Sequence, residues 1–185
     1  FLRRHRHKLY QSLRDDGNAD LFITLTANKN WRELHGLNIF NDAQCVARVF
    51  KARLHAFWVH IRRNEILGNL LQVSFSIEWQ RRGPPHAHCL VWLRGNDRVL
   101  SIAEVNELIT VHWSDNDDLD HLCQTLMTHS CKCGRCKNHP DALCFKLFPM
   151  QPREQSIVHK GFYQPKRELG EEWNVSCNLT LMGLW

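Results

Sequence analysis

The chain has 185 residues, of which 43% are hydrophobic, and it carries a formal net charge of +5. This length suits one domain, or one domain with a small added module, and the apolar fraction excludes a disordered chain. No apolar run approaches the roughly 20 residues needed to cross a bilayer, which excludes a helical membrane span. This positive net charge modestly favours polyanionic partners.

Basic residues are gathered in blocks. The first block, residues 3–8, holds three arginines, two histidines and a lysine, and arginine pairs stand at residues 62–63 and 81–82. A basic run is commonly a solvated surface. The blocks alone therefore do not distinguish a solvated surface from one that contacts nucleic-acid phosphates.

Two elements are predicted after the first basic block. Residues 21–26 (LFITLT) alternate in character from one residue to the next, which predicts a strand. From about Asp42 to Leu67, apolar residues recur at intervals of three and four, which predicts an amphipathic helix. Asn41 or Asp42 can cap its start, and Gly68 stands where a helix ends.

A pair of strands is predicted next. Residues 71–80 alternate between apolar and polar side chains, and residues 86–93 follow as a second strand. The segment Arg81–Pro85 interrupts the first strand, because neither of its prolines can donate to a ladder. Two strands with so short a connection are expected to pair antiparallel.

The remaining sequence is less regular. Ser101 and Glu104 form a capping box, which predicts a helix running to about Trp113. Asp115–Asp120 is interpreted as an acidic loop, and residues 121–144 show no readable periodicity.

His86 and His88 are the first candidate site residues. Residues two apart on a strand point to the same face, so both imidazoles can bind one divalent ion. Glu78 and Gln80 share a face of the preceding strand, which could supply an oxygen as third ligand. Such a nitrogen and oxygen site suits Mg²⁺ or Mn²⁺. A His-x-His pair also occurs by chance, so a structural pair and a catalytic zinc in a hydrolase remain alternatives at this point.

The cysteines form the second candidate site. Five of the eight fall between residues 123 and 144, beside histidines, which indicates a reducing compartment and a metal site rather than a disulfide scaffold. Free thiols are the alternative. A loop-rich segment without a core would gain its folding energy from a structural Zn²⁺. The preferred ligands are His129, Cys133, Cys136 and Cys144, with Cys131 or His139 as substitutes.

Several stretches together resemble the replication-initiator domain of Helitron transposases, a histidine-hydrophobe-histidine endonuclease. The string Ile77–His88 (IEWQRRGPPHAH) is similar to the family's central motif, and Leu21–Asn28 to its first strand. Ala47–Phe50 resembles part of its following helix, and Cys144–Pro149 its cysteine-basic-Phe-Pro segment. The resemblance covers nearly the whole chain in the family's order.

This resemblance implies an α+β fold, in which helices flank a central antiparallel sheet of about five strands and a zinc-binding segment is added. It also implies a catalytic metal held by His86, His88 and a polar residue of the neighbouring strand. Gln80 is preferred to Glu78 there, because Gln80 stands nearer the turn and matches the family's glutamine.

The family cleaves single-stranded DNA with a tyrosine nucleophile and forms a 5′-phosphotyrosine link. Neither Tyr10 nor Tyr163 matches that motif, so the tyrosine is expected beyond Trp185. The expected organisation is an endonuclease core over 1–120, a zinc-binding segment over 121–150, and a return to the core over 151–185, truncated before the nucleophile helix.

The function implied is nicking and strand transfer in rolling-circle transposition, with a helicase domain on the same full-length chain and a nuclear location. The rivals are a catalytically inactive single-stranded DNA-binding module derived from such a nickase and, more weakly, an unrelated zinc hydrolase. Trp58 and Trp79 lie on apolar faces and are expected in the core. The expected DNA contacts are Arg3, Arg4, Arg6, Arg81, Arg82 and Trp31.

Overall fold

The computed structural model describes residues 17–38, 41–79, 83–97, 101–113, 116–133, 136–137, 142–159 and 162–185, and of residues 96, 133 and 162 the backbone alone. The chain divides into two compact units, Phe1–Val99 and Leu100–Trp185. The sequence predicts that the endonuclease core ends near residue 120, whereas the boundary between the two units follows Val99. That residues 151–185 return to the core stays a prediction.

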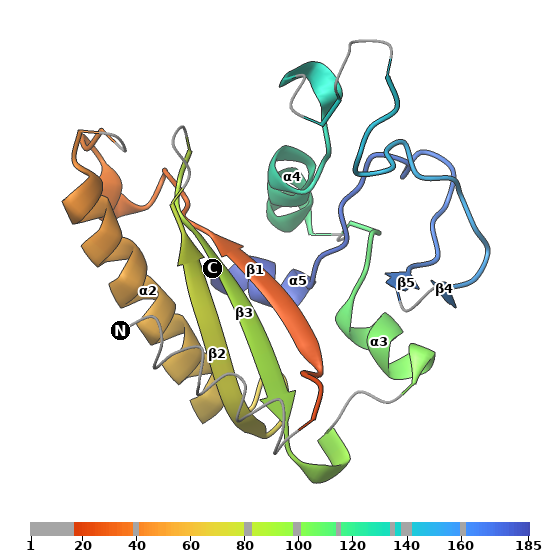
Figure 1. Cartoon of the computed structure of the whole chain (residues 1–185), viewed down its shortest axis with the longest axis horizontal. Helices are drawn as coiled ribbons and strands as arrows, with labels where there is room; N and C mark the ends of the chain where they lie inside the picture. Colours follow the sequence, from red (N-terminus) through yellow and green to blue (C-terminus); the bar gives the residue numbers. More distant parts are fainter. Residues whose placement is uncertain are drawn as a thin grey trace. The chain divides into compact units, whose positions relative to one another are not determined.

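The first unit is built on a three-stranded antiparallel sheet of β1 (Leu21–Thr26), β2 (Leu70–Glu78) and β3 (His86–Leu93) (Figure 1). The strand order is β1-β3-β2, so β3 lies in the middle and pairs with both neighbours. The predicted antiparallel pair is therefore confirmed, and β1 adds a third strand on the other side of β3.

Helix α2 (Ala43–Arg63) supplies much of the apolar core of this unit. Its buried stripe follows the predicted three- and four-residue spacing and consists of Val46, Phe50, Leu54, Phe57, Trp58 and Ile61. The Trp58 side chain of α2 interacts with Cys89 of β3, so α2 packs against the β3 face that carries Cys89, and burial there raises the pKa of Cys89 to about 12. Ala87, Cys89 and Val91 are fully buried on that face.

Helix α2 ends at Arg63, four residues before the predicted end at Leu67. The Asn64 side-chain amide donates to the carbonyl of His60 at 2.9 Å, which occupies an acceptor at the end of the last turn. Glu65 then adopts a positive φ of 49°, a backbone conformation that does not continue a helix.

The opposite face of the sheet is partly open. The Trp92 indole, 1% exposed, donates to the carbonyl of Gly17 at 3.0 Å, so the segment before β1 covers this end of β3. At the other end, His86 and His88 are half-buried, and their β1 neighbours Thr24 and Thr26 are exposed. The histidine pair therefore lies on the accessible part of this face.

The second unit contains α3 (Ile102–Leu108), α4 (Asp117–Leu126), β4 (Ile157–His159), β5 (Phe162–Gln164) and α5 (Leu179–Leu184). The capping box at Ser101 is present, but α3 ends at Leu108 because Ile109 is extended and Thr110 pairs with Cys177. No helix in the described ranges is long and apolar enough to span a membrane.

Two sequence-based expectations are wrong here. The acidic stretch begins helix α4 rather than a loop from Asp117 onward: Asn116 caps it by accepting from Leu119 N at 3.0 Å, and aspartates in a first turn suit the helix dipole. The described residues also form no five-stranded sheet. Within the described ranges, strands β4 and β5 pair only with each other, and further segments meet through isolated bridges such as Arg153 with Arg167.

Candidate metal centres

The histidine pair of the first unit is positioned by the register of three strands. His86 on β3 stands opposite Thr26 of β1 and Glu78 of β2, and His88 stands opposite Thr24 and Ser76. Because cross-strand partners share a face, these six side chains form two adjacent rows on the accessible side of the sheet.

Each imidazole is held by hydrogen bonds from the flanking strands. The Nδ1 atom of His86 lies 2.7 Å from Thr26 Oγ1, and the Nδ1 atom of His88 lies 3.1 Å from Thr24 Oγ1. On its other side, His88 Nε2 lies 3.0 Å from Glu78 Oε2. His86 stands next to this pair, opposite Glu78 in register.

Burial favours the uncharged form of His86. Burial lowers the pKa of His86; the negative charge of Glu78 opposes this shift and His88 adds to it. A neutral imidazole keeps a lone pair, which a metal ligand requires.

An exposed aromatic ring lies at the edge of this site. The Phe22 ring of β1 is 66% exposed and stacks on His88 with a centroid distance of 5.8 Å and an interplanar angle of 8°. Sequence reasoning assigned no role to Phe22, Thr24 or Thr26. The alternation within residues 21–26 could have revealed them, because it places all three on the face opposite the aliphatic residues.

The structure describes some of the site residues predicted from the sequence and not others. Glu78 is within hydrogen-bonding distance of His88, whereas Gln80, preferred from the sequence, lies outside the described residues. Arg3, Arg4, Arg6, Arg81 and Arg82 also lie outside them.

Of the three tryptophan expectations with a described outcome, those for Trp31 and Trp79 need correction. Trp31 is 5% exposed, its ring stacks on Phe50 at 6.3 Å, and the Arg53 guanidinium lies 5.0 Å from the ring centroid. This burial gives Trp31 a packing role and leaves no open ring face for a base. Trp58 is buried as expected, but Trp79 is 51% exposed and outside the core, because β2 ends just before it.

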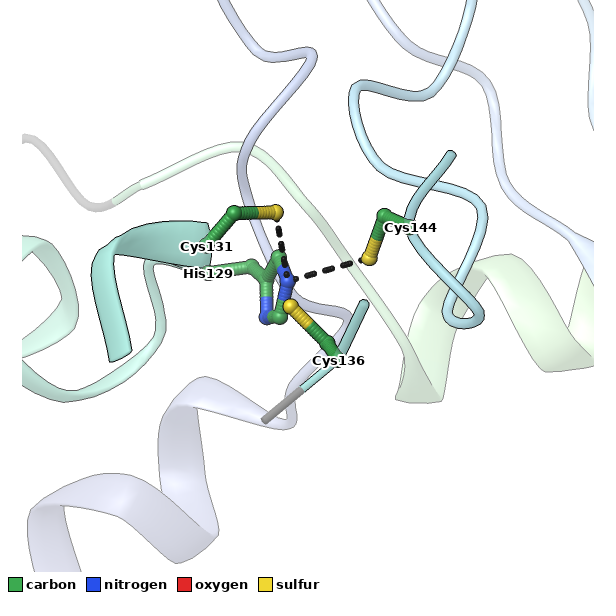
Figure 2. A group of neighbouring side chains, drawn as sticks. All are labelled: His129, Cys131, Cys136 and Cys144. Carbon is green, nitrogen blue, oxygen red and sulfur yellow. Dashed lines mark hydrogen bonds between the residues drawn. The ribbon is translucent and has the colours of Figure 1, made fainter. Parts of the chain in front are cut away.

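The second unit holds a compact group of potential metal ligands. The ligand atoms of His129, Cys131, Cys136 and Cys144 all lie within 4.8 Å of one another (Figure 2). His129 Nε2 is 3.5 Å from Cys131 Sγ and 3.3 Å from Cys144 Sγ. In a tetrahedral zinc site with bonds of about 2.0–2.3 Å, neighbouring ligand atoms are about 3.6 Å apart. The group could therefore hold a metal such as zinc.

Local packing holds these ligands in place. The His129 ring stacks on Phe148 at 4.4 Å, and its backbone N–H donates to the carbonyl of Trp173 at 2.8 Å. Cys136 and Cys144 are 6% and 4% exposed, and the N–H of Phe145 donates to the Cys136 carbonyl.

The thiols differ in acidity. Burial raises the pKa of Cys131 to about 11, and the neighbouring thiols of Cys136 and Cys144 reinforce the shift. Burial acts in the same direction on Cys144, but backbone N–H groups of Phe148 and Lys146 outweigh it and lower the Cys144 pKa to about 6. Cys144 is thus prepared to bind a cation as a thiolate at neutral pH.

Three of the four preferred zinc ligands occur in the group, and Cys131, a substitute in the sequence analysis, completes it. The Cys133 side chain and His139 lie outside the described residues. A short 3-10 turn over Cys131–Cys133 places Cys131 beside His129, which spacing alone did not reveal.

Comparison with known proteins finds a similarity within the first unit. Residues 1–91 match a family model described as the Helitron helicase-like domain at N-terminus, and this match contains both histidines and the β1 threonines. The cysteine group lies after the matched residues. No curated protein matches the chain. The N-terminal 91 residues therefore match the Helitron-type domain that the sequence motifs resemble.

Proposed function

We propose that the chain nicks single-stranded DNA and transfers strands in Helitron-type rolling-circle transposition, with His86, His88 and Glu78 binding Mg²⁺ or Mn²⁺. One observation carries this proposal: His88 Nε2 and Glu78 Oε2 lie 3.0 Å apart beside His86, on an accessible face. Adjacent ligands of an octahedral ion with bonds of about 2.1 Å are separated by about 3.0 Å. The donor set, two imidazoles and a carboxylate, suits such an ion.

The bound ion would neutralise charge that develops on the scissile phosphate. The proposed nucleophile is a tyrosine oxygen, which bonds to phosphorus while the P–O3′ bond breaks; the 3′ oxygen leaves as a hydroxyl and a 5′-phosphotyrosine forms. Tyr163 of the second unit donates its hydroxyl proton to Asn106 Oδ1 at 2.7 Å. We place the nucleophile in a segment following Trp185, as the family resemblance implies.

Single-stranded DNA is the proposed partner. Phe22 replaces Trp31 as the aromatic candidate for base stacking, because its exposed ring lies in line with the histidines on the accessible face. The basic blocks would supply phosphate contacts. We further propose that the full-length protein carries a helicase domain and acts in the nucleus.

The metal part of the proposal is tested by calorimetric titration of Mn²⁺ into zinc-loaded protein. His86→Ala and His88→Ala should each abolish measurable binding, because each removes one of three protein ligands. His55→Ala is the matched control, since His55 is exposed on α2 away from the pair. Native affinity in both site variants would refute the assignment.

The catalytic part is tested with a labelled oligonucleotide. The 185-residue chain should bind single strands without cleaving them, whereas a chain extended through the next helix should nick with Mg²⁺ and form a covalent 5′ adduct. An adduct on Tyr163 would refute the placement of the nucleophile. An extended chain that contains tyrosines, binds single strands and forms no adduct would favour the inactive binding module.

For the cysteine group, we propose a structural Zn²⁺ held by His129, Cys131, Cys136 and Cys144. The support is a donor set of three thiols and one imidazole, which provides the four ligands of a closed tetrahedral site. Packing around His129 and the burial of two thiols fit a structural role rather than an open catalytic position.

A further inference from the structure

The bonds between the two histidines and the neighbouring strand concern a specific nitrogen. Thr24 and Thr26 lie on β1, and they are 64 and 60 residues from His88 and His86 in the sequence. Each nevertheless places its hydroxyl at the Nδ1 atom of the histidine opposite it in register. The arrangement repeats in two adjacent rows, so one geometry serves both rings.

A neutral imidazole has one N–H and one lone pair, and a hydrogen bond at one nitrogen selects which form is present. If Nδ1 carries the proton, it donates to the threonine oxygen and Nε2 keeps the lone pair. If Nε2 carries the proton, the threonine hydroxyl donates to Nδ1 and no lone pair remains for a metal at Nε2.

We propose that Thr24 and Thr26 are positioning residues, which accept from Nδ1–H of His88 and His86 and thereby present both Nε2 lone pairs to the divalent ion. The inference rests on the proposed metal site. In His88 the second nitrogen already lies 3.0 Å from Glu78, so the threonine bond and the carboxylate occupy opposite sides of one ring. The parallel Phe22 ring, stacked at 8°, restricts rotation of His88 out of this plane.

Threonine suits this role on a strand. Its β-branched side chain favours extended backbone and has a restricted χ1, so the hydroxyl position follows from the strand itself. Outer hydrogen bonds of this kind fix the ring orientation and raise ligand basicity, and their loss commonly weakens metal affinity about 10- to 100-fold.

The test compares isosteric and conservative variants. Thr24→Val and Thr26→Val remove the hydroxyl while preserving shape and β propensity, and Thr24→Ser and Thr26→Ser retain the hydroxyl. Ser74→Ala is the control, because it removes a hydroxyl from the same face of β2, opposite Leu90 rather than a histidine. All are titrated with Mn²⁺ after zinc loading.

We expect the double valine variant to bind Mn²⁺ about 10- to 100-fold more weakly, and the serine variants and control to bind close to the native value. A second readout is the ¹⁵N spectrum of histidine-labelled protein with Mg²⁺. Native His86 and His88 should show protonated Nδ1, and the valine variants a mixture of tautomers.

Native Mn²⁺ affinity with unchanged tautomers in the valine variants would overturn the inference. Equal losses in the serine and valine variants would also overturn it, because the hydroxyl would then not be the cause. The proposed metal site fails separately: in that case His86→Ala and His88→Ala would keep native Mn²⁺ affinity.

Discussion

Loss of one cysteine ligand should destabilise the second unit, and Cys136→Ser is the sharpest form of this test. Cys136 is 6% exposed and belongs to the four-residue group around His129. Serine is shorter and a poorer zinc ligand, so the substitution should remove one metal bond while leaving the backbone hydrogen bond from Phe145 possible.

The expected magnitude follows from the four-ligand geometry. Structural zinc sites in small peptides bind with about 10–16 kcal/mol at pH 7, so one ligand of four accounts for about 3 kcal/mol. At equal free zinc, this corresponds to binding about 100-fold weaker and to a loss of stability of about 3 kcal/mol. A unit the length of Leu100–Trp185 has a total stability of only about 4–13 kcal/mol.

Thermal unfolding followed by circular dichroism, with zinc content measured in parallel, gives the readout. For a domain of this size, a loss of about 3 kcal/mol lowers the transition temperature by about 12–24 °C. A chelator should lower the transition of native protein in the same direction. Cys45→Ser is the matched control, because Cys45 is exposed on α2 and belongs to the first unit.

Two results would refute the reasoning. Equal zinc content and equal transition temperatures in Cys136→Ser and native protein would show that Cys136 is not a ligand. Native protein without zinc, and with a transition insensitive to chelator, would show that the second unit folds without a metal.

Three further outcomes are expected. Leu54 of α2 is 1% exposed, so Leu54→Ala should lower the free energy of unfolding, measured by urea denaturation, by about 2–5 kcal/mol. A loss below about 1 kcal/mol would contradict a core role for Leu54. Ser101→Ala removes the capping box of α3 and should cost about 1 kcal/mol, seen as faster hydrogen exchange within that helix alone, since α3 buries none of its residues. Zinc affinity should rise with pH, because zinc binds thiolates and burial raises the pKa of the Cys131 thiol to about 11. It should fall as the pH drops through about 6, because the pKa of Cys144 is lowered to about 6 and this thiolate then becomes protonated. A pH-independent affinity in competition titrations would contradict thiolate ligation.

Much of the first unit was predictable from the sequence. The strand over residues 21–26, the buried stripe of α2 and the antiparallel pair around the proline turn all follow from periodicities of two or of three and four residues. The face shared by His86 and His88 follows from the same period of two. Such patterns can be read locally, because the apolar residues on the buried face of a strand or helix recur with the period of that element.

The tertiary structure decided the features that depend on which distant segments meet. The bond from His86 to Thr26 spans 60 residues, and the bond from His88 to Thr24 spans 64, so both require the strand order β1-β3-β2. The choice of Cys131 as a neighbour of His129 depends on a turn without periodicity. Trp31 became a core residue because α2 brings Phe50 and Arg53 to its ring. Composition and spacing determine which chemistry is available, whereas register and packing between distant segments determine which atoms reach one another.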